Sequence, residues 1–315
     1  MILITGGMGF IGMHVARELA ATDEVVLGYN RTVRGPEEMT ELIGRLVPSV
    51  RIDIASPYSV ARAVAEYRPD SIVHLAVPAL GAFPPAEETL TNVTGLLNVL
   101  EAAKNGGVSR VSLASSLAVY AGLDDGPLIE TRDLPVHSSS ATGAMKKAEE
   151  TLALHYGDRT GLDLVLLRIA VIYGPLYSTL ANLAGRLTHL AVRGGLPERV
   201  AGPWTASQLP GGLDLCYVRD CAAAISTIHT AERPAHHIYN IGAGQAVTAA
   251  DLLEAVAKAV PDAALPEELR ETTAPPPDRT HMDISRIHHE FGWTPGFSVE
   301  SGVRDYAEWL TDHAL

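Results

Sequence analysis

Short apolar runs alternate with longer amphipathic segments over the first half of the chain. Six nearly continuous apolar runs are typical of strands that are covered on both faces of a sheet. They occupy residues 2–5, 25–27, 50–52, 71–76, 111–113 and 162–167. Longer segments predict helices at 11–20 and at 86–104, where Leu90 and Leu97 belong to an apolar stripe with a spacing of about 3.6 residues. This alternation predicts a parallel, doubly wound α/β sheet.

The pattern changes after Gly174. Glycine and proline are frequent in residues 194–213, and proline in 261–278, so both segments are expected to be irregular. Thr248 is expected to cap a helix that carries Asp251 in its first turn. The other predicted elements are helices at 178–193 and 219–229, a strand at 237–241, and two short helices within 284–312.

These segments predict two domains, and 315 residues are enough for both. A Rossmann-type dinucleotide-binding domain would comprise residues 1–174 and about 214–242. A smaller C-terminal α/β substrate-binding lobe would comprise about 175–213 and 243–315.

Composition narrows the classes of partner and compartment. The apolar fraction is 47% and the formal charge is 24 − 37 = −13. An acidic surface repels nucleic acid and anionic lipid, so neither is an expected partner. Two cysteines, Cys216 and Cys221, fit a reducing compartment better than a disulfide framework. The first strand leaves no room for a signal peptide, and no apolar run reaches the roughly 20 residues of a membrane span. A cytoplasmic location is therefore expected.

Gly6, Gly9 and Gly12 lie between the first predicted strand and the first predicted helix. Gly6 permits a tight turn, Gly9 lets the backbone approach a pyrophosphate, and Gly12 lets the helix pack closely on the strand. The helix N-terminus attracts the anion. The alternative is a purely structural turn, but the position after an N-terminal strand favours a dinucleotide site.

The end of the second strand usually decides between NAD and NADP, because an acidic residue there binds the ribose 2′-hydroxyl of NAD. This chain has Asn30 and Arg31 instead. Arg31, helped by Arg34, is expected to hold the 2′-phosphate of NADP; the alternative is a solvated loop arginine. Asp53 follows the third strand, where a carboxylate either accepts from the adenine amine or stabilises a turn.

Residues 5–12 (TGGMGFIG) resemble the opening of the extended short-chain dehydrogenases, the NAD-dependent epimerase/dehydratase family. Similar pieces recur in order at 72–76 (IVHLA), 92–103 (NVTGLLNVLEAA), 115–120 (SSLAVY), 168–175 (RIAVIYGP), 239–242 (YNIG) and 291–295 (FGWTP). The resemblance implies an enzyme that uses NADP or NAD on a sugar or a related hydroxy or keto molecule.

The resemblance also implies roles for particular residues. Ser116 would hydrogen-bond the substrate oxygen, Lys146 would hold the nicotinamide ribose, and Asn92 would position the lysine through water. Family dimers imply a homodimer through helices 86–104 and 141–157. The expected cofactor-binding residues are Gly6, Gly9, Phe10, Ile11, Gly12, Asn30, Arg31, Asp53, Ile54, Leu75, Ala76 and Lys146.

Three departures from the family pattern stand out. Thr142 occupies the place of the catalytic tyrosine four residues before Lys146, and none of the ten tyrosines has a lysine at that spacing. As part of the same departure, Met145 replaces a common serine. Residues 208–218 lack an arginine that many sugar-nucleotide members carry, and residues 275–279 (PPPDR) differ from the usual basic segment, although Arg279 remains available. The last two differences disfavour a nucleotide diphosphate on the substrate.

The missing tyrosine changes the expected proton chemistry. An ammonium group one helical turn away lowers a tyrosine pKa from about 10 and makes the phenol a usable acid and base. A threonine hydroxyl is far less acidic, so Thr142 is expected to hold a water or the substrate. His137 precedes the same helix and is the best substitute proton carrier, because an imidazole titrates near neutral pH; the alternative is a solvated loop histidine.

Three functions therefore remain open. The first is an NAD(P)-dependent epimerase, dehydratase or ketoreductase with non-standard proton transfer. The second is a non-redox lyase, isomerase or cyclase on the same scaffold, and the third is a silent NADP(H)-binding protein. The paired histidines at 236–237 and 288–289 lack ligand spacing, so no metal site is expected.

Overall fold

The computed structural model describes residues 1–77, 83–123, 127–138, 140–200, 213–266, 269 and 281–313. The chain divides into two compact units. The first unit comprises Met1–Leu123, Asp133–Ile169 and Ala222–Tyr239, and the second comprises Asp124–Arg132, Ala170–Cys221 and Asn240–Leu315. Compared with the expected domains, four segments fall in the second unit instead of the first: residues 124–132, 170–174, 214–221 and 240–242. Two of them, 170–174 and 214–221, contribute strands that pair with each other in a separate sheet.

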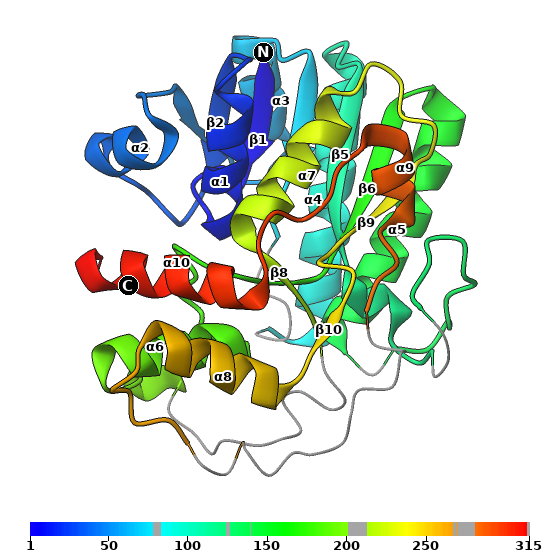
Figure 1. Cartoon of the computed structure of the whole chain (residues 1–315). Helices are drawn as coiled ribbons and strands as arrows, with labels where there is room; N and C mark the ends of the chain where they lie inside the picture. Colours follow the sequence, from blue (N-terminus) through cyan, green and yellow to red (C-terminus); the bar gives the residue numbers. More distant parts are fainter. Residues whose placement is uncertain are drawn as a thin grey trace. The chain divides into compact units, whose positions relative to one another are not determined.

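A seven-stranded sheet with the order β3-β2-β1-β4-β5-β6-β9 forms the centre of the doubly wound fold (Figure 1). Its strands are β1 (Ile2–Thr5), β2 (Val25–Tyr29), β3 (Ser49–Arg51), β4 (Ser71–His74), β5 (Arg110–Ser116), β6 (Asp163–Ile169) and β9 (Ile238–Ile241). Neighbouring strands from β3 to β6 are parallel, so their carboxyl ends meet at one edge. The predicted α/β fold class is confirmed, and β4 ends two residues earlier than expected.

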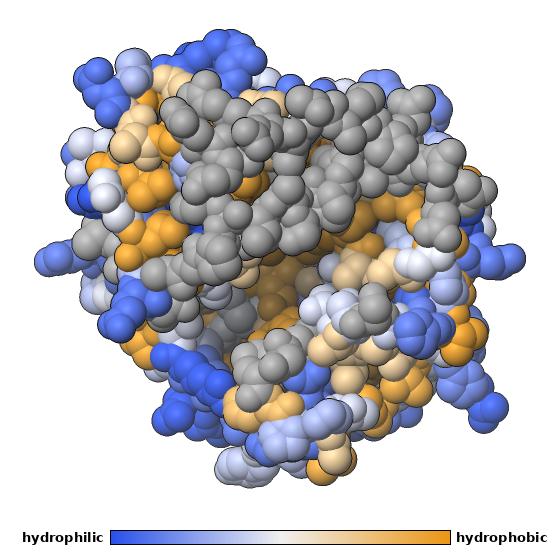
Figure 2. Space-filling view, turned by 90° about the horizontal axis from the view of Figure 1, so that it is seen from below, coloured by the Kyte–Doolittle hydropathy of each residue, from blue (hydrophilic) through white to orange (hydrophobic). Residues whose placement is uncertain are grey.

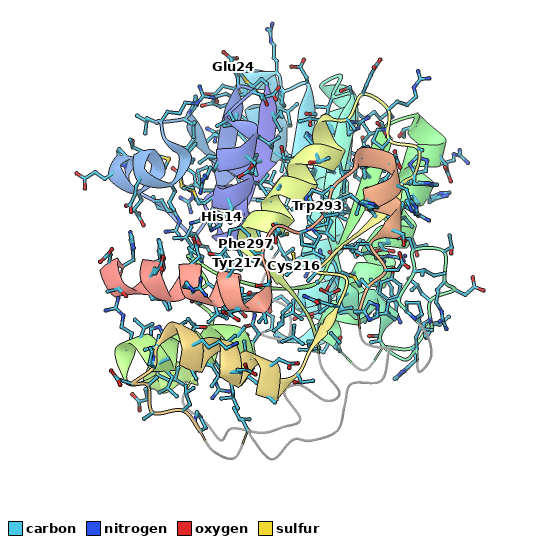
Figure 3. All side chains as sticks on the ribbon, viewed as in Figure 1. His14, Glu24, Cys216, Tyr217, Trp293 and Phe297 are labelled. Atoms are coloured by element: carbon cyan, nitrogen blue, oxygen red, sulfur yellow. The ribbon has the colours of Figure 1, made fainter. Side chains whose placement is uncertain are left out.

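Helices cover both faces of this sheet. They are α1 (Phe10–Leu19), α2 (Pro36–Ile43), α3 (Pro57–Tyr67), α4 (Pro85–Asn105), α5 (Ala141–Thr160) and α7 (Val218–Thr230), the last of which begins in the second unit. Buried residues of α3, α4 and α5 share one apolar cluster with β1, β2 and β4–β6. On α1, His14 is buried and meets the Phe10 ring edge-on, with 6.3 Å between centroids (Figure 3).

The second unit contains a smaller sheet with the order β10-β8-β7. β7 (Val171–Tyr173) runs parallel to β8 (Leu213–Tyr217), and β10 (Ala246–Val247) runs antiparallel to it. The helices are α6 (Leu183–Arg193), α8 (Ala249–Ala259), α9 (Ser285–Phe291) and α10 (Val299–Asp312). Leucine, valine and tyrosine side chains of α6, α8 and α10 form one core with β8. Tyr217 contacts the Phe297 ring with centroids 4.5 Å apart (Figure 3).

Local signals explain where several helices begin and end. Thr248 caps α8 and forms a capping box with Asp251, as predicted. Ser140 caps α5 by accepting from Gly143 N, and Gly161 ends that helix with φ +74°. The segment expected as a helix from 178 becomes helical only at Leu183, because Asn182 caps α6. Residues 201–212, 267–268 and 270–280 of the two segments expected to be irregular lie outside the described residues.

Both cysteines are buried and free. Among the described residues, no helix has the length and apolar character needed to cross a membrane. Hydrophilic residues follow much of the rim of the face drawn in Figure 2.

Candidate functional site

The glycine turn at the carboxyl end of β1 tolerates no side chain at two of its positions. Gly6 has φ +70°, and a Cβ there would lie 2.9 Å from Ala76 N. A Cβ on Gly12 would lie 2.2 Å from Gly6 O and 2.8 Å from Gly7 Cα. Because these contacts are with backbone atoms, no side-chain rotation relieves them. The close approach of α1 to the turn thus depends on glycine, as the sequence predicted.

The N-terminus of α1 is suited to an anion. Its N-cap residue is Gly9, which offers no side-chain acceptor to the first-turn amides, and the first turn contains no acidic residue. Uncapped amides and the positive end of the helix dipole attract phosphate groups. Phe10, Ile11 and Gly12 supply amides in this turn, so the residues present fit a dinucleotide pyrophosphate.

The predicted 2′-phosphate residues differ in their surroundings. Asn30 and Arg31 follow β2 and are exposed, and no described residue bonds to the Arg31 side chain. Arg34 donates from Nε to Met8 O at 3.0 Å and from Nη1 to Glu38 at 2.9 Å. Arg34 is therefore already paired with a carboxylate, whereas Arg31 is exposed and has no hydrogen bond to a described residue.

Asp53 and Ile54, which the sequence assigned to the cofactor, have different environments. Asp53 is exposed, and its Oδ1 accepts from Ala55 N at 3.1 Å, which is the turn-stabilising arrangement considered as the alternative. Ile54 is buried, and its side chain comes so close to Gly95 of α4 that a Cβ there would lie 2.9 Å away. Leu75 N donates to Thr5 O at 3.1 Å, which continues the β4 pairing beyond His74.

Lys146 is buried on α5, one turn after the partly exposed Thr142. Residues four apart share a helix face, so both side chains extend from one side of α5. Lys146 Nζ donates to Glu149 Oε2 at 2.7 Å, and both side chains are 6% exposed. The pair is an i,i+3 ion pair within one helix.

His74, at the end of β4, contributes a buried neutral imidazole. Its Nδ1 lies 2.6 Å from Thr5 Oγ1. Burial, and secondarily the charge of Lys146, lower the pKa of His74 to about 3. His74 is therefore neutral near neutral pH, and Lys146 is the cation of this region.

Ser116 and Thr142 lie on elements that pack together. Ser116 ends β5, and its Oγ accepts from Ala118 N at 3.1 Å at the start of the 3₁₀ helix η1 (Leu117–Tyr120). α5 packs on both β5 and η1. A Cβ on Gly143 would lie 2.6 Å from Ala118 O, so the first turn of α5 lies directly on η1.

Asn92 and His137 have contrasting environments. Asn92 is 3% exposed on α4, and its Nδ2 donates to Glu88 O at 2.8 Å. Its Oδ1 has no hydrogen-bond donor among the described residues, which is the usual situation of an oxygen that binds an ordered water. His137 is exposed, and its backbone oxygen accepts from Lys147 Nζ at 3.0 Å. No described hydrogen bond links His137 to Thr142 or Lys146.

A second buried pair stabilises the same helix. Glu150 accepts from Arg168 Nη2 at 2.8 Å and from Arg168 Nε at 3.0 Å, and Ser115 Oγ donates to it at 2.5 Å. Arg168 also donates to Tyr120 Oη at 2.9 Å. These groups attach α5 to β5, β6 and η1.

Sequence reasoning missed Glu149, His74 and Thr5. The i,i+3 spacing of Lys146 and Glu149 was a usable signal, whereas the contact between Thr5 and His74 joins residues 69 positions apart. Within the described part of the chain, no cluster of three histidine, cysteine or acidic side chains could hold a metal ion.

Comparisons with known proteins agree with this geometry. The model of the NAD-dependent epimerase/dehydratase family matches residues 2–242. UDP-glucuronic acid decarboxylase 6 of Arabidopsis thaliana is 28% identical over 319 residues, which cover 96% of this chain and 86% of the relative. UDP-glucuronate 4-epimerase of Thermodesulfobacterium geofontis (strain OPF15) is 28% identical over 331 residues, with coverage of 99% and 96%. The solved UDP-glucose 4-epimerase of Thermus thermophilus, in complex with NAD, superimposes with a TM-score of 0.81 at 29% identity and covers 99% of both chains.

The fold and the glycine turn define a protein of the Rossmann class. The chain belongs to the NAD-dependent epimerase/dehydratase family. It is an enzyme of the extended short-chain dehydrogenase type.

Proposed function

We propose that the chain binds a nicotinamide dinucleotide and catalyses hydride chemistry on a sugar, as an epimerase, dehydratase or decarboxylase would. The observation that carries the proposal is the turn formed by Gly6, Gly9 and Gly12, which a Cβ would fill and whose helix N-terminus has no acceptor of its own. A nicotinamide held there would supply reversible hydride transfer at a sugar carbon. The relatives named above support a sugar nucleotide as substrate.

Residues on α5, β5 and α4 would hold the cofactor, orient the substrate and transfer the proton. Lys146 would hold the nicotinamide ribose, and the free oxygen of Asn92 would fix a water beside it. Ser116 would orient the substrate hydroxyl. A water held by Thr142 would relay the proton of that hydroxyl to the solvent, because a threonine hydroxyl is too weak an acid to exchange it directly.

The first experiment measures dinucleotide binding and turnover together. Calorimetric titration with NAD and NADP should show binding of at least one of them. Incubation with UDP-glucose, UDP-glucuronate and dTDP-glucose, with products separated by chromatography, should show conversion of one. Failure to bind either dinucleotide would exclude the proposal.

Thr142→Tyr probes the unusual position directly. If the site is a modified redox site, ordinary epimerase or reductase activity appears or rises in Thr142→Tyr, or in Thr142→Tyr combined with Glu149→Gln, which removes the carboxylate paired with Lys146. If the native activity collapses and neither variant shows a new one, the threonine belongs to a different chemistry. Thr142→Ser keeps the hydroxyl and serves as the matched control.

We propose NADP(H) as the preferred cofactor, because Arg31 is an exposed cation after β2 and that strand end has no carboxylate. A charged hydrogen bond to a 2′-phosphate contributes about 1.5–3 kcal/mol, or roughly 10- to 100-fold in affinity. Arg31→Ala should therefore weaken NADP by about that factor and leave NAD unchanged. Arg34→Ala is the control, since Arg34 is paired with Glu38. Equal affinity of the native protein for NAD and NADP would contradict the assignment.

A non-redox lyase, isomerase or cyclase is the second candidate. The observation in its favour is Thr142, since the position that normally exchanges a proton with the substrate holds no acid or base. This function predicts product formation after the dinucleotide has been stripped from the protein. Activity that returns only when dinucleotide is added back would exclude it.

A homodimer through α4 and α5 is also proposed. Leu90 and Leu97 lie two turns apart on α4, and they are 69% and 38% exposed despite their apolar side chains. The two helices pack on each other, and Tyr156 Oη donates to Glu101 at 2.7 Å between them. A second copy of the same helix pair would cover the exposed leucines.

A further inference from the structure

Glu149 is a buried acidic side chain bonded to Lys146, the residue that the proposed function assigns to the nicotinamide ribose. It is 5% exposed, and its carboxylate lies 2.7 Å from Lys146 Nζ. A carboxylate is rarely buried unless it is paired, and one partner left alone in such a pair is strongly unfavourable. The lysine charge is therefore balanced within α5 itself.

The other charged groups described near Lys146 do not compete with Glu149 for its ammonium group. Glu150 is bonded to Arg168 and Ser115, so it is not available to Lys146. His74, which faces Lys146 from β4, is neutral near neutral pH. Lys147 donates to backbone oxygens before the helix. Glu149 is thus the one anion bonded to Lys146 among the described residues.

Position 142 lies one turn before Lys146 on the same face of α5. An unpaired ammonium there would stabilise an ionised hydroxyl at position 142, since an opposite charge within a few ångströms favours the charged form. A lysine paired with a carboxylate acts at that distance as a dipole, whose field is weaker and falls off faster. A threonine hydroxyl does not ionise, so it loses nothing from this pairing.

We infer that Glu149 and Thr142 are functionally linked through Lys146. Glu149 is the positioning residue of Lys146, and its carboxylate neutralises the ammonium charge that would otherwise activate a hydroxyl at position 142. The inference rests on the proposed function in assigning Lys146 to the cofactor. It predicts that a tyrosine placed at position 142 is not activated unless the Glu149 charge is also removed.

Ionisation of that tyrosine tests the inference without any assay of activity. Thr142→Tyr is introduced into the native chain and into Glu149→Gln, and the phenol is titrated by ultraviolet difference spectroscopy against the parent that retains Thr142. In the native background the phenol pKa should stay at or above about 10. In Glu149→Gln it should fall by about 1–3 pH units. Asp158→Asn, which removes an acidic charge about three turns further along α5, is the matched control and should not lower it.

The outcomes separate this inference from the proposed function. Equal phenol pKa values in the native and Glu149→Gln backgrounds would overturn it. A phenol pKa well below 10 after Thr142→Tyr alone would also overturn it. This measurement on the single variant remains available if Glu149→Gln fails to fold. Dinucleotide titration of the native chain decides the proposed function independently, because the phenol titration requires no bound cofactor.

Discussion

Two buried histidines predict that acid begins to destabilise the fold below about pH 6.5. His229 on α7 is 3% exposed, and its ring nitrogens lie 2.7 Å from Ser112 Oγ and 2.8 Å from Ser71 Oγ. Burial, with a smaller contribution from the charge of Arg110, lowers the pKa of His229 to about 3. His74 is shifted to the same value.

The sign of the effect follows from proton uptake. The unfolded chain binds a proton at each histidine below about pH 6.5, whereas the folded chain does not until about pH 3, so stability falls as the pH falls between these values. At about pH 5, the loss is about 2 kcal/mol of unfolding free energy for each histidine.

The assay is urea unfolding of the native protein and of His229→Gln at about pH 7.5 and about pH 5. The variant should be less stable at the higher pH, because glutamine does not reproduce both ring hydrogen bonds. It should lose about 2 kcal/mol less than the native protein on acidification. His155→Gln, at an exposed position on α5, is the control and should follow the native protein.

The native protein has to be compared with the variant because another buried group, Asp214, changes the unfolding free energy in the opposite direction on acidification. Burial raises the pKa of Asp214 to about 6, although its carboxylate accepts from Ala243 N, Gly244 N and Met282 N. Protonation of Asp214 therefore favours the folded state as the pH falls through 6. If the native protein and His229→Gln lose the same free energy on acidification, the assignment of a neutral buried imidazole is wrong.

Three further predictions concern the turn, the core and the dimer. Gly12→Val should weaken dinucleotide binding by about tenfold or more in calorimetry, because its Cβ meets Gly6 O. Unchanged affinity would contradict the assignment of the glycine turn to the dinucleotide. Glu150→Ala should lower the unfolding free energy by about 3–5 kcal/mol in urea, since it leaves the Arg168 charge buried without its carboxylate; a loss below about 1 kcal/mol would mean that water solvates the arginine. Leu90→Glu should shift the protein to monomer in sedimentation velocity, and a native protein that is already monomeric would exclude the dimer.

Hydrophobic patterning was sufficient for the main sheet but not for the smaller one. The strands of the main sheet are apolar runs bounded by turns, and their order along the chain matches the prediction. β7, β8 and β10 escaped prediction because β7 and β10 are only three and two residues long and β8 carries Asp214 within its apolar residues. α2 and α3 also escaped, although each begins with proline, a residue favoured in the first helical turn.

The sequence by itself determined the glycine turn, the helix that carries Thr142 and Lys146, and the shared face of those two residues, because these features depend on spacing within a few turns. It left two carboxylates within reach of the lysine, Glu149 at i+3 and Glu150 at i+4. Only the tertiary structure decided between them, because Arg168 of β6 and Ser115 of β5 bind Glu150 and leave Glu149 to Lys146. The partners of a buried charge are fixed by strands that pack against the helix, and no local pattern specifies them.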